Sequence, residues 1–237
     1  MTEAFRQHEP FRRDVRDALA LSTGILLALG FIKHLAAAWP WFRENAWFSY
    51  GTVGAALQLY GPIALIGHRG VSQETLGLTL RNWRRDLLGL CVLALLTIVP
   101  YGLGHHLWQT VVEGRAFIPK IAPHLGMVIL TQIFLVALPE EVFFRGLLQE
   151  RFERVWPEKR RWVGSPVGWA LVAQAAVFAL AHFVGEYRFD RLGPFFPGLL
   201  FGLLRARTGT IVGAVGYHAF CNVLSVVLFA CYARGPA

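Results

Sequence analysis

Two adjacent carboxylates, Glu140 and Glu141, follow an uncharged run over residues 121–139 that is long enough to form a membrane helix. A carboxylate in or beside hydrocarbon costs free energy unless it is paired, hydrated or used in chemistry. Glu141 and Arg145 are four residues apart and share one face of a helix, which Glu140 does not share. The spacing therefore predicts an ion pair between Glu141 and Arg145 and leaves Glu140 free to point elsewhere. The alternative interpretation is a solvated cluster at the end of a helix.

The later apolar runs contain few other polar groups that could take part in chemistry. His182 ends the segment 178–182, and His218 and Asn222 lie four residues apart in the last run, so that they face the same way. An imidazole N–H and a side-chain amide are suitable donors to negative charge that develops on an oxygen atom. Each could instead be a packing residue or form a hydrogen bond to a neighbouring helix. Together with Glu140 they are candidates for a catalytic site.

The composition is that of a membrane protein. Of 237 residues, 55% are hydrophobic and 16% are charged, whereas soluble domains contain roughly 25% charged residues. The formal net charge is +8, but Lys and Arg lie between the apolar runs, so the charge indicates contact with anionic lipid and not with nucleic acid. Cys91, Cys221 and Cys231 lie inside apolar runs without a CxxC motif, which predicts neither disulfides nor a thiolate metal site.

Seven uncharged runs are candidate membrane helices. They cover residues 18–32, 46–67, 87–112, 121–139, 162–184, 192–204 and 208–233. The sixth run is too short for a straight crossing of ~30 Å at about 1.5 Å per residue, so it is either a short tilted helix or a half-helix. Gly198 and Gly202 are four residues apart, a spacing that permits close contact with another helix. The pattern predicts an all-α fold, a polytopic transmembrane bundle of about seven to eight helices.

The chain is predicted to form one domain that follows a charged arm. Residues 1–17 form a cytoplasmic or interfacial arm, and residues 18–237 form a single transmembrane domain whose motifs lie within 138–222. Lys and Arg are more frequent in alternate loops beginning with the arm, so the positive-inside rule favours a cytoplasmic amino terminus and, after seven crossings, an external carboxyl terminus. The run at 18–32 is interpreted as an uncleaved span and not as a signal peptide, because a lysine and a histidine separate it from the possible cleavage site.

Helix geometry places the four candidate side chains at similar depth. They lie ~15 to ~22 Å from the cytoplasmic ends of their helices, which is near the middle of the bilayer. Two glutamines in the same runs, Gln132 and Gln174, are expected to form interhelical hydrogen bonds.

Three motifs occur in order on separate apolar runs: Glu140-Glu141-x-x-x-Arg145, Phe178-x-x-x-His182 and His218-x-x-x-Asn222. In these motifs the chain resembles the CPBP family, the CAAX-protease and bacteriocin-processing (Abi) intramembrane glutamic proteases. The resemblance covers about residues 121–233. It implies an all-α membrane protease whose site lies in a cavity between helices and needs no metal or other cofactor.

The resemblance also implies a role for each position. Four positions would act on the reacting atoms: Glu140 as general base, His182 in holding and polarising the water, and His218 and Asn222 in stabilising the tetrahedral oxyanion. The supporting residue Arg145 would fix Glu141 and the helix. The substrate would be a membrane-tethered protein or peptide, cut near its terminus. The Arg-, Ala-, Leu- and Gly-rich composition indicates a bacterial origin, which favours a sorting-type, myxosortase-like role at the inner (cell) membrane over cleavage of prenylated CAAX proteins.

Other functions make different demands on the same residues. A zinc protease would use Glu140, His182 and His218 as ligands, in the manner of three-ligand catalytic sites. A non-catalytic membrane scaffold or immunity factor could have the same fold. A transporter would show repeated halves with paired broken helices, and the sequence has no such repeat. The sequence leaves open the substrate and its lipidation, the side to which the site opens, and the oligomeric state.

Overall fold

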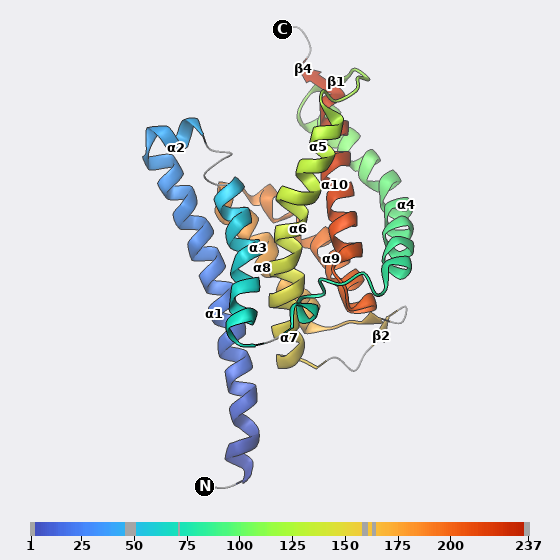
Figure 1. Cartoon of the computed structure of the whole chain (residues 1–237). Helices are drawn as coiled ribbons and strands as arrows, with labels where there is room; N and C mark the ends of the chain where they lie inside the picture. The colour runs from blue at the N-terminus through green and yellow to red at the C-terminus, as the bar shows by residue number, and fades with distance from the viewer. Residues whose placement is uncertain (1–2, 46–50, 71, 158–160, 163–164, 235–237) are drawn as a thin grey trace.

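In the computed structural model, the apolar runs of the sequence form helices that pack into one bundle (Figure 1). The structure describes residues 3–45, 51–70, 72–157, 161–162 and 165–234. The α-helices are α1 (Glu3–Ala38), α2 (Pro40–Glu44), α3 (Gly54–His68), α4 (Trp83–Leu107), α5 (Leu125–Thr131), α6 (Leu138–Glu141), α7 (Glu150–Val155), α8 (Trp169–Glu186), α9 (Phe195–Thr208) and α10 (Val212–Ala230). The remaining helical segments are the 3-10 turns η2 (Gln73–Leu76) and η6 (Phe189–Leu192) and the π-helical segments η3 (Trp108–Val112), η4 (Gln132–Ala137) and η5 (Val142–Gln149).

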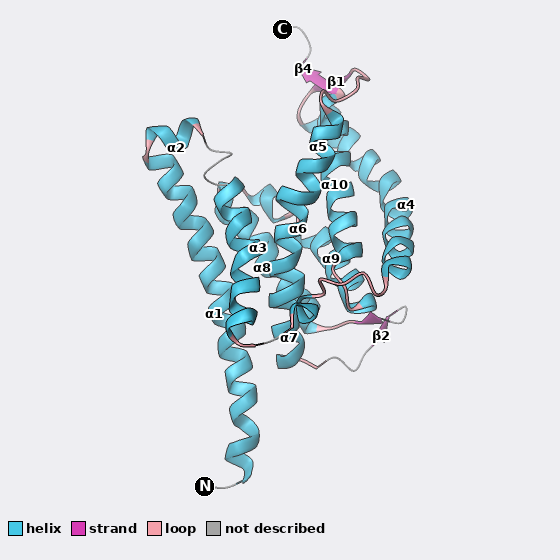
Figure 2. Ribbon diagram, viewed as in Figure 1, coloured by secondary structure: helices cyan, strands magenta, loops and turns pink. Residues whose placement is uncertain are grey.

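The strands are short and lie toward the ends of the bundle (Figure 2). β1 (Arg115–Phe117) pairs antiparallel with β4 (Tyr232–Arg234) beside the carboxyl terminus, and β2 (Arg161–Trp162) pairs antiparallel with β3 (Ser165–Pro166). The predicted all-α bundle is therefore confirmed. The three cysteines are free thiols.

Four helical stretches are long and apolar enough to cross a membrane: Arg12–Leu35, Trp83–Val112, Leu125–Val155 and Val212–Ala230. They make the chain an integral membrane protein. The prediction of seven full spans exceeds this number by three. The apolar part of α8, Trp169–Val184, is shorter than the four stretches, and α3 has only 15 residues and α9 only 14. At about 1.5 Å per residue, neither helix reaches across ~30 Å of hydrocarbon without help from its flanking residues. The shortness of the sixth run is confirmed, and the expected start of the second run at residue 46 lies outside the described residues.

The two termini lie at opposite ends of the bundle, and the first turns of α1 project beyond the other helices (Figure 1). The charged arm does not form an element of its own, because α1 continues without a break from Glu3 to Ala38. Arg69, which follows α3, donates from Nη1 to Oδ2 of Asp17 over 3.2 Å. The side chain of Arg69 is 43% exposed and that of Asp17 is 15% exposed. A partly exposed pair of this kind adds little stability, but it joins α1 to the end of α3.

The stretch that carries the two glutamates is irregular along its length. The short helix α6 lies between the π-helical segments η4 and η5, and Pro139 occupies its first turn. Proline has no N–H to bond the carbonyl four residues earlier, so the regular hydrogen-bond ladder cannot pass through it. The interruption at Pro139 takes the form of π-helical hydrogen bonding on both sides of the carboxylates. Such segments occur frequently at functional sites.

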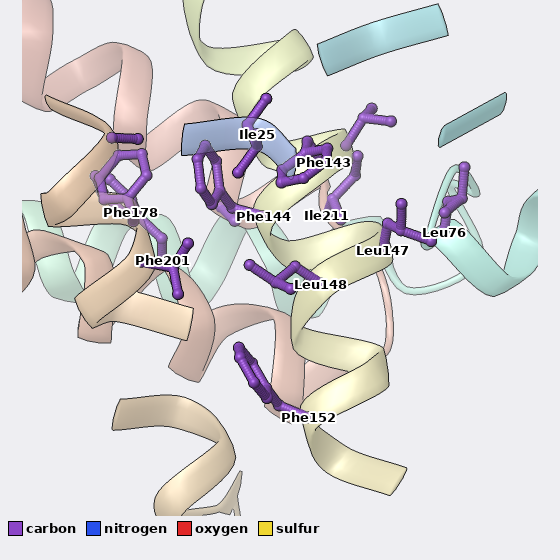
Figure 3. Packing of buried hydrophobic residues seen from close by; sticks show 14 of the residues in the cluster. Ile25, Leu76, Phe143, Phe144, Leu147, Leu148, Phe152, Phe178, Phe201 and Ile211 are labelled. Atoms are coloured by element: carbon purple, nitrogen blue, oxygen red, sulfur yellow. The ribbon is translucent and has the colours of Figure 1, made fainter. Parts of the chain in front are cut away.

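Every residue of η5 is buried, and its apolar side chains lie at the centre of the hydrophobic core (Figure 3). Phe144 of η5 packs edge-on against Phe178 of α8, with 5.0 Å between the ring centroids. Phe178 in turn contacts Phe201 of α9, with 6.1 Å between centroids. The core thus joins α8 and α9 to the segment that directly follows the glutamates.

Gly198 and Gly202 allow α9 to lie close to α8 and η5. A Cβ atom at position 202 would lie 2.5 Å from both Leu171 Cδ1 and Gln174 Nε2, and one at position 198 would lie 3.1 Å from Phe178 Cδ1. No side chain fits at such distances without displacing its neighbours. The close helix contact predicted from the glycine spacing is confirmed.

Candidate active site inside the bundle

The ion pair predicted between Glu141 and Arg145 is present, and both side chains are fully buried. Arg145 donates from Nη1 to Glu141 Oε1 over 3.0 Å and from Nη2 to the carbonyl of Gly198 over 3.1 Å. Its guanidinium carbon also lies 4.2 Å from the ring centroid of Phe178 and 5.0 Å from that of Phe201. A buried charge is tolerated where it is paired, hydrogen-bonded and packed on aromatic faces, as this one is.

His218 lies between the two glutamates. Its Nδ1 donates to Glu141 Oε1 over 2.8 Å, and its Nε2 is 3.8 Å from Glu140 Oε2. His218 is 3% exposed, and its imidazole stacks on Phe201 with ring centroids 4.6 Å apart and an interplanar angle of 14°. Glu141 Oε1 therefore accepts hydrogen bonds from both Arg145 and His218, which fixes the imidazole with its second nitrogen on the side of Glu140.

Among the described ion pairs, Glu140 has none with an arginine. Its side chain is 18% exposed, and its Oε2 is buried with no hydrogen-bond partner in the part of the chain that the structure describes. It lines a cavity of about 140 Å³ together with His182. Leu29 of α1 and Val136 of η4 contribute to the walls, and α3 contributes others. Glu140 thus faces a small, mostly apolar cavity that is partly open to the outside, and a cavity of this size can hold several water molecules.

His182 enters the same cavity from α8. Its Nδ1 donates to the carbonyl of Phe178, one turn earlier, over 2.9 Å, and its ring lies edge-on to the Phe178 ring at 4.6 Å. Because Nδ1 carries a hydrogen in this bond, Nε2 of the neutral ring is an acceptor. The histidine of the second motif is therefore held in one orientation by the phenylalanine of the same motif.

Asn222 lies one turn beyond His218 on α10, and its amide is engaged elsewhere. Asn222 Nδ2 donates to Gln132 Oε1 of η4 over 2.9 Å. Among the hydrogen bonds of the described residues, this side chain makes none to another candidate residue. The structure therefore brings Glu140, Glu141, Arg145, His182 and His218 together and leaves Asn222 at the neighbouring level of the bundle.

Both glutamines form the interhelical hydrogen bonds expected of them. Gln132 bonds Asn222 as described, and Gln174 of α8 donates to the carbonyl of Gly198 in α9 over 3.0 Å. The carbonyl of Gly198 thus accepts from both Gln174 and Arg145.

One cavity residue escaped the sequence analysis. Gln58 of α3 is 6% exposed and lines the cavity with Glu140 and His182. The signal for it was its polarity within the uncharged run at 46–67, the same signal that drew attention to the histidines. It belongs to no motif, however, and apolar runs often contain a glutamine that only binds its own backbone.

The described residues include no group of three His, Cys, Asp or Glu side chains arranged to hold a metal ion.

The polytopic helical bundle contains buried carboxylates next to imidazoles. A membrane protein with such a cluster can carry out acid–base chemistry inside the bilayer. The family comparison is more specific: residues 122–224 match the family described as type II CAAX prenyl endopeptidase Rce1-like. This match covers less than half of the chain and supports the resemblance to the CPBP family of intramembrane CAAX-type endopeptidases that the motifs indicated. The matched region contains all six candidate residues, whereas α1, α3 and α4 precede it. Neither a curated protein nor a solved structure matches the chain.

Proposed function

We propose that the protein is a glutamic-type intramembrane endopeptidase, which hydrolyses a peptide bond near the terminus of a membrane-tethered protein or peptide. The observation that carries this proposal is the position of Glu140. Among the described residues this carboxylate pairs with no arginine; it shares a partly open cavity with His182 and lies 3.8 Å from Nε2 of His218. A base in reach of water and a nearby imidazole are the groups that amide hydrolysis needs.

In the proposed reaction, Glu140 and His182 hold a water molecule in the cavity. Glu140 takes a proton from this water as the water oxygen bonds to the carbonyl carbon of the scissile peptide. The carbonyl oxygen becomes an oxyanion, and the carbon becomes tetrahedral. When the C–N bond breaks, the proton held by Glu140 passes to the leaving nitrogen, which departs as an amine.

His218 provides charge balance in this scheme. With Nδ1–H donated to Glu141, an N–H at Nε2 exists only when the ring is doubly protonated and carries a positive charge. The cluster of Glu140, Glu141, Arg145 and His218 then has no net charge, which suits an apolar interior. The Nε2–H is the donor that we assign to the oxyanion.

Asn222 supplies a second donor to the oxyanion. Its amide nitrogen carries two hydrogens, and Gln132 accepts one of them. The other remains for the oxyanion, and Gln132 holds the amide in a fixed orientation for this purpose.

Composition and the distribution of charge support the proposed substrate and cellular setting. A sorting-type, myxosortase-like enzyme of a bacterial inner membrane fits the composition, with the amino terminus in the cytoplasm. Arg13, Arg69 and Arg154 line one cavity beside the first half of α1, so basic side chains gather at the amino-terminal end of the bundle. The positive-inside rule associates such an end with the cytoplasm.

Cleavage assays with two reconstituted probes would test the proposal. One probe is a farnesylated peptide that ends in a CAAX sequence, and the other is an unlipidated peptide that ends in an apolar helix. The wild-type protein should cleave one of them, and Glu140→Gln should lower kcat about 10²- to 10⁴-fold, because it removes the base. Glu113→Gln is the matched control, since Glu113 lies beyond η3 and pairs only with Arg115 among the described ion pairs. A cellular phenotype that Glu140→Gln leaves unchanged would favour the scaffold or immunity factor.

Chelation tests the remaining alternative. Strong chelators should leave the cleavage rate unchanged if carboxylate and imidazole activate the water without a metal. Loss of activity that added zinc restores would favour a zinc protease.

A further inference from the structure

The buried face of α3 contains one strongly polar side chain. Gly54, Gln58, Pro62 and Ile66 are the buried residues of this helix, and they recur every four positions along one stripe. This stripe faces the segment that contains the glutamates. A glutamine in such a position is desolvated, so its amide needs partners inside the protein.

The amide of Gln58 is only half satisfied. Its Nε2 donates to the carbonyl of Gly54 over 3.2 Å, which fixes which end of the amide is nitrogen and which is oxygen. Its Oε1 is buried and has no hydrogen-bond partner among the described residues. Gln58 therefore lines the cavity and keeps one acceptor without a partner, and because Oε1 itself is covered, the amide must rotate slightly before a ligand in the cavity can reach it.

The chemistry of the cavity indicates what this acceptor is for. A peptide bond can be hydrolysed only in an unwound segment, and an unwound segment in hydrocarbon has backbone N–H groups without partners. Of the polar side chains that line the cavity, Glu140 and His182 are already assigned to the water. Gln58 Oε1 is the acceptor that this assignment leaves over. The other walls, such as Leu29, Leu135 and Ala181, offer no side-chain acceptor.

We propose that Gln58 is a substrate-binding residue, whose Oε1 accepts a hydrogen bond from a backbone N–H of the unwound peptide beside the scissile bond. This inference rests on the proposed function. It adds a role for α3, which lies outside the matched region 122–224, in holding the substrate across the cavity from α8.

Ester substitution in the substrate tests this hydrogen bond directly. In a series of probes, each amide N–H near the scissile bond is replaced in turn by an ester oxygen. For the wild type, the ester at one position should lower kcat/KM about tenfold, the size expected for one hydrogen bond. Gln58→Met, which keeps the length of the side chain without the acceptor, should lower kcat/KM on the amide probe by a similar factor. On the ester probe at that position, the wild type and Gln58→Met should be equal.

Two controls separate this outcome from a packing effect and from failure of the proposed function. Gln109→Met makes the same substitution at a buried glutamine in η3, away from the cavity, and should cleave all probes like the wild type. Binding is measured separately with the Glu140→Gln variant, which should not cleave the probes. Adding Gln58→Met to this variant should lower its affinity for the amide probe but not for the ester probe. This binding test holds even if neither probe is cleaved by the wild type.

The inference is overturned if Gln58→Met lowers kcat/KM or affinity by the same factor for amide and ester probes at every position. It is also overturned if neither probe binds the Glu140→Gln variant. If Gln58→Met does not fold, Gln58→Glu replaces it, since a carboxylate oxygen restores an acceptor. The Gln58→Glu variant should retain the difference in kcat/KM between amide and ester probes. Loss of this difference would also count against the inference.

Discussion

Nδ1 of His218 donates a hydrogen bond to Oε1 of Glu141 over 2.8 Å, between residues that are 77 positions apart in the chain. The same oxygen accepts from Nη1 of Arg145 over 3.0 Å. The buried ion pair is thereby joined to the imidazole, and the other nitrogen of that imidazole is 3.8 Å from Glu140. Glu141 consequently orients the imidazole next to the carboxylate that we propose as the base.

Replacing Glu141 by Gln should impair catalysis without impairing binding. The variant keeps the size of the side chain but removes the negative charge that holds the imidazolium and the guanidinium. We expect kcat to fall about 100-fold, as for the loss of one oxyanion donor, with KM within about twofold of the wild type. Steady-state kinetics on the cleaved probe would measure both. A rise in KM with unchanged kcat would contradict a positioning role for Glu141.

Replacing Arg145 by Met should destabilise the fold. It leaves the fully buried Glu141 without its cation, and breaking one side of a buried ion pair costs about 3–5 kcal/mol. Reversible unfolding in mixed micelles would measure the loss, and the double variant Glu141→Gln/Arg145→Met should recover part of it. Arg69→Met is the control, because its pair with Asp17 is more exposed and should contribute less than about 1 kcal/mol.

Replacing Gly202 by Ala should loosen the contact of α9 with α8. The added methyl group would lie 2.5 Å from Leu171 Cδ1 and Gln174 Nε2, which are the ends of flexible side chains. Because Gln174 is buried and hydrogen-bonded to Gly198, we expect a cost of about 1 kcal/mol, at the low end for overpacking. Gly24→Ala in α1 is the matched control, because a Cβ there meets no atom within 4 Å. The control should leave the stability unchanged or raise it by up to about 1 kcal/mol, because alanine favours helix. Equal destabilisation of both variants would show that helix packing is not the cause.

Replacing Asn222 or Gln132 by Leu, one at a time, should distinguish the proposed oxyanion donor from the residue that orients it. Asn222→Leu removes the proposed oxyanion donor and should lower kcat about 10²- to 10³-fold. Gln132→Leu removes only the acceptor that holds this amide, at 2.9 Å, and should lower kcat about tenfold, the equivalent of one hydrogen bond. Single-turnover kinetics would measure both rates. Equal losses in the two variants would indicate that the pair acts only by joining α10 to η4.

The sequence was informative wherever both partners lie on one helix. The pair Glu141 and Arg145 was predictable because a spacing of four residues places two side chains on one face in almost any α-helix. The shortness of α9 and the close approach at Gly202 were predictable for the same reason, since length and side-chain volume are local properties. The membrane class followed from composition, because hydrocarbon excludes most charged side chains. The three motifs, taken in order, were enough to indicate the family.

Only the tertiary structure decided which distant faces meet. That one imidazole contacts both glutamates, that Asn222 binds Gln132 across 90 positions, and that Gln58 lines the cavity of Glu140 all depend on the packing of helices against one another. The two π-helical segments around Pro139 add to this dependence. A change in residues per turn rotates every side chain that follows, so sequence spacing alone does not give the direction in which a glutamate points. Local backbone geometry determined the helices and their pairs, and packing between them determined the site.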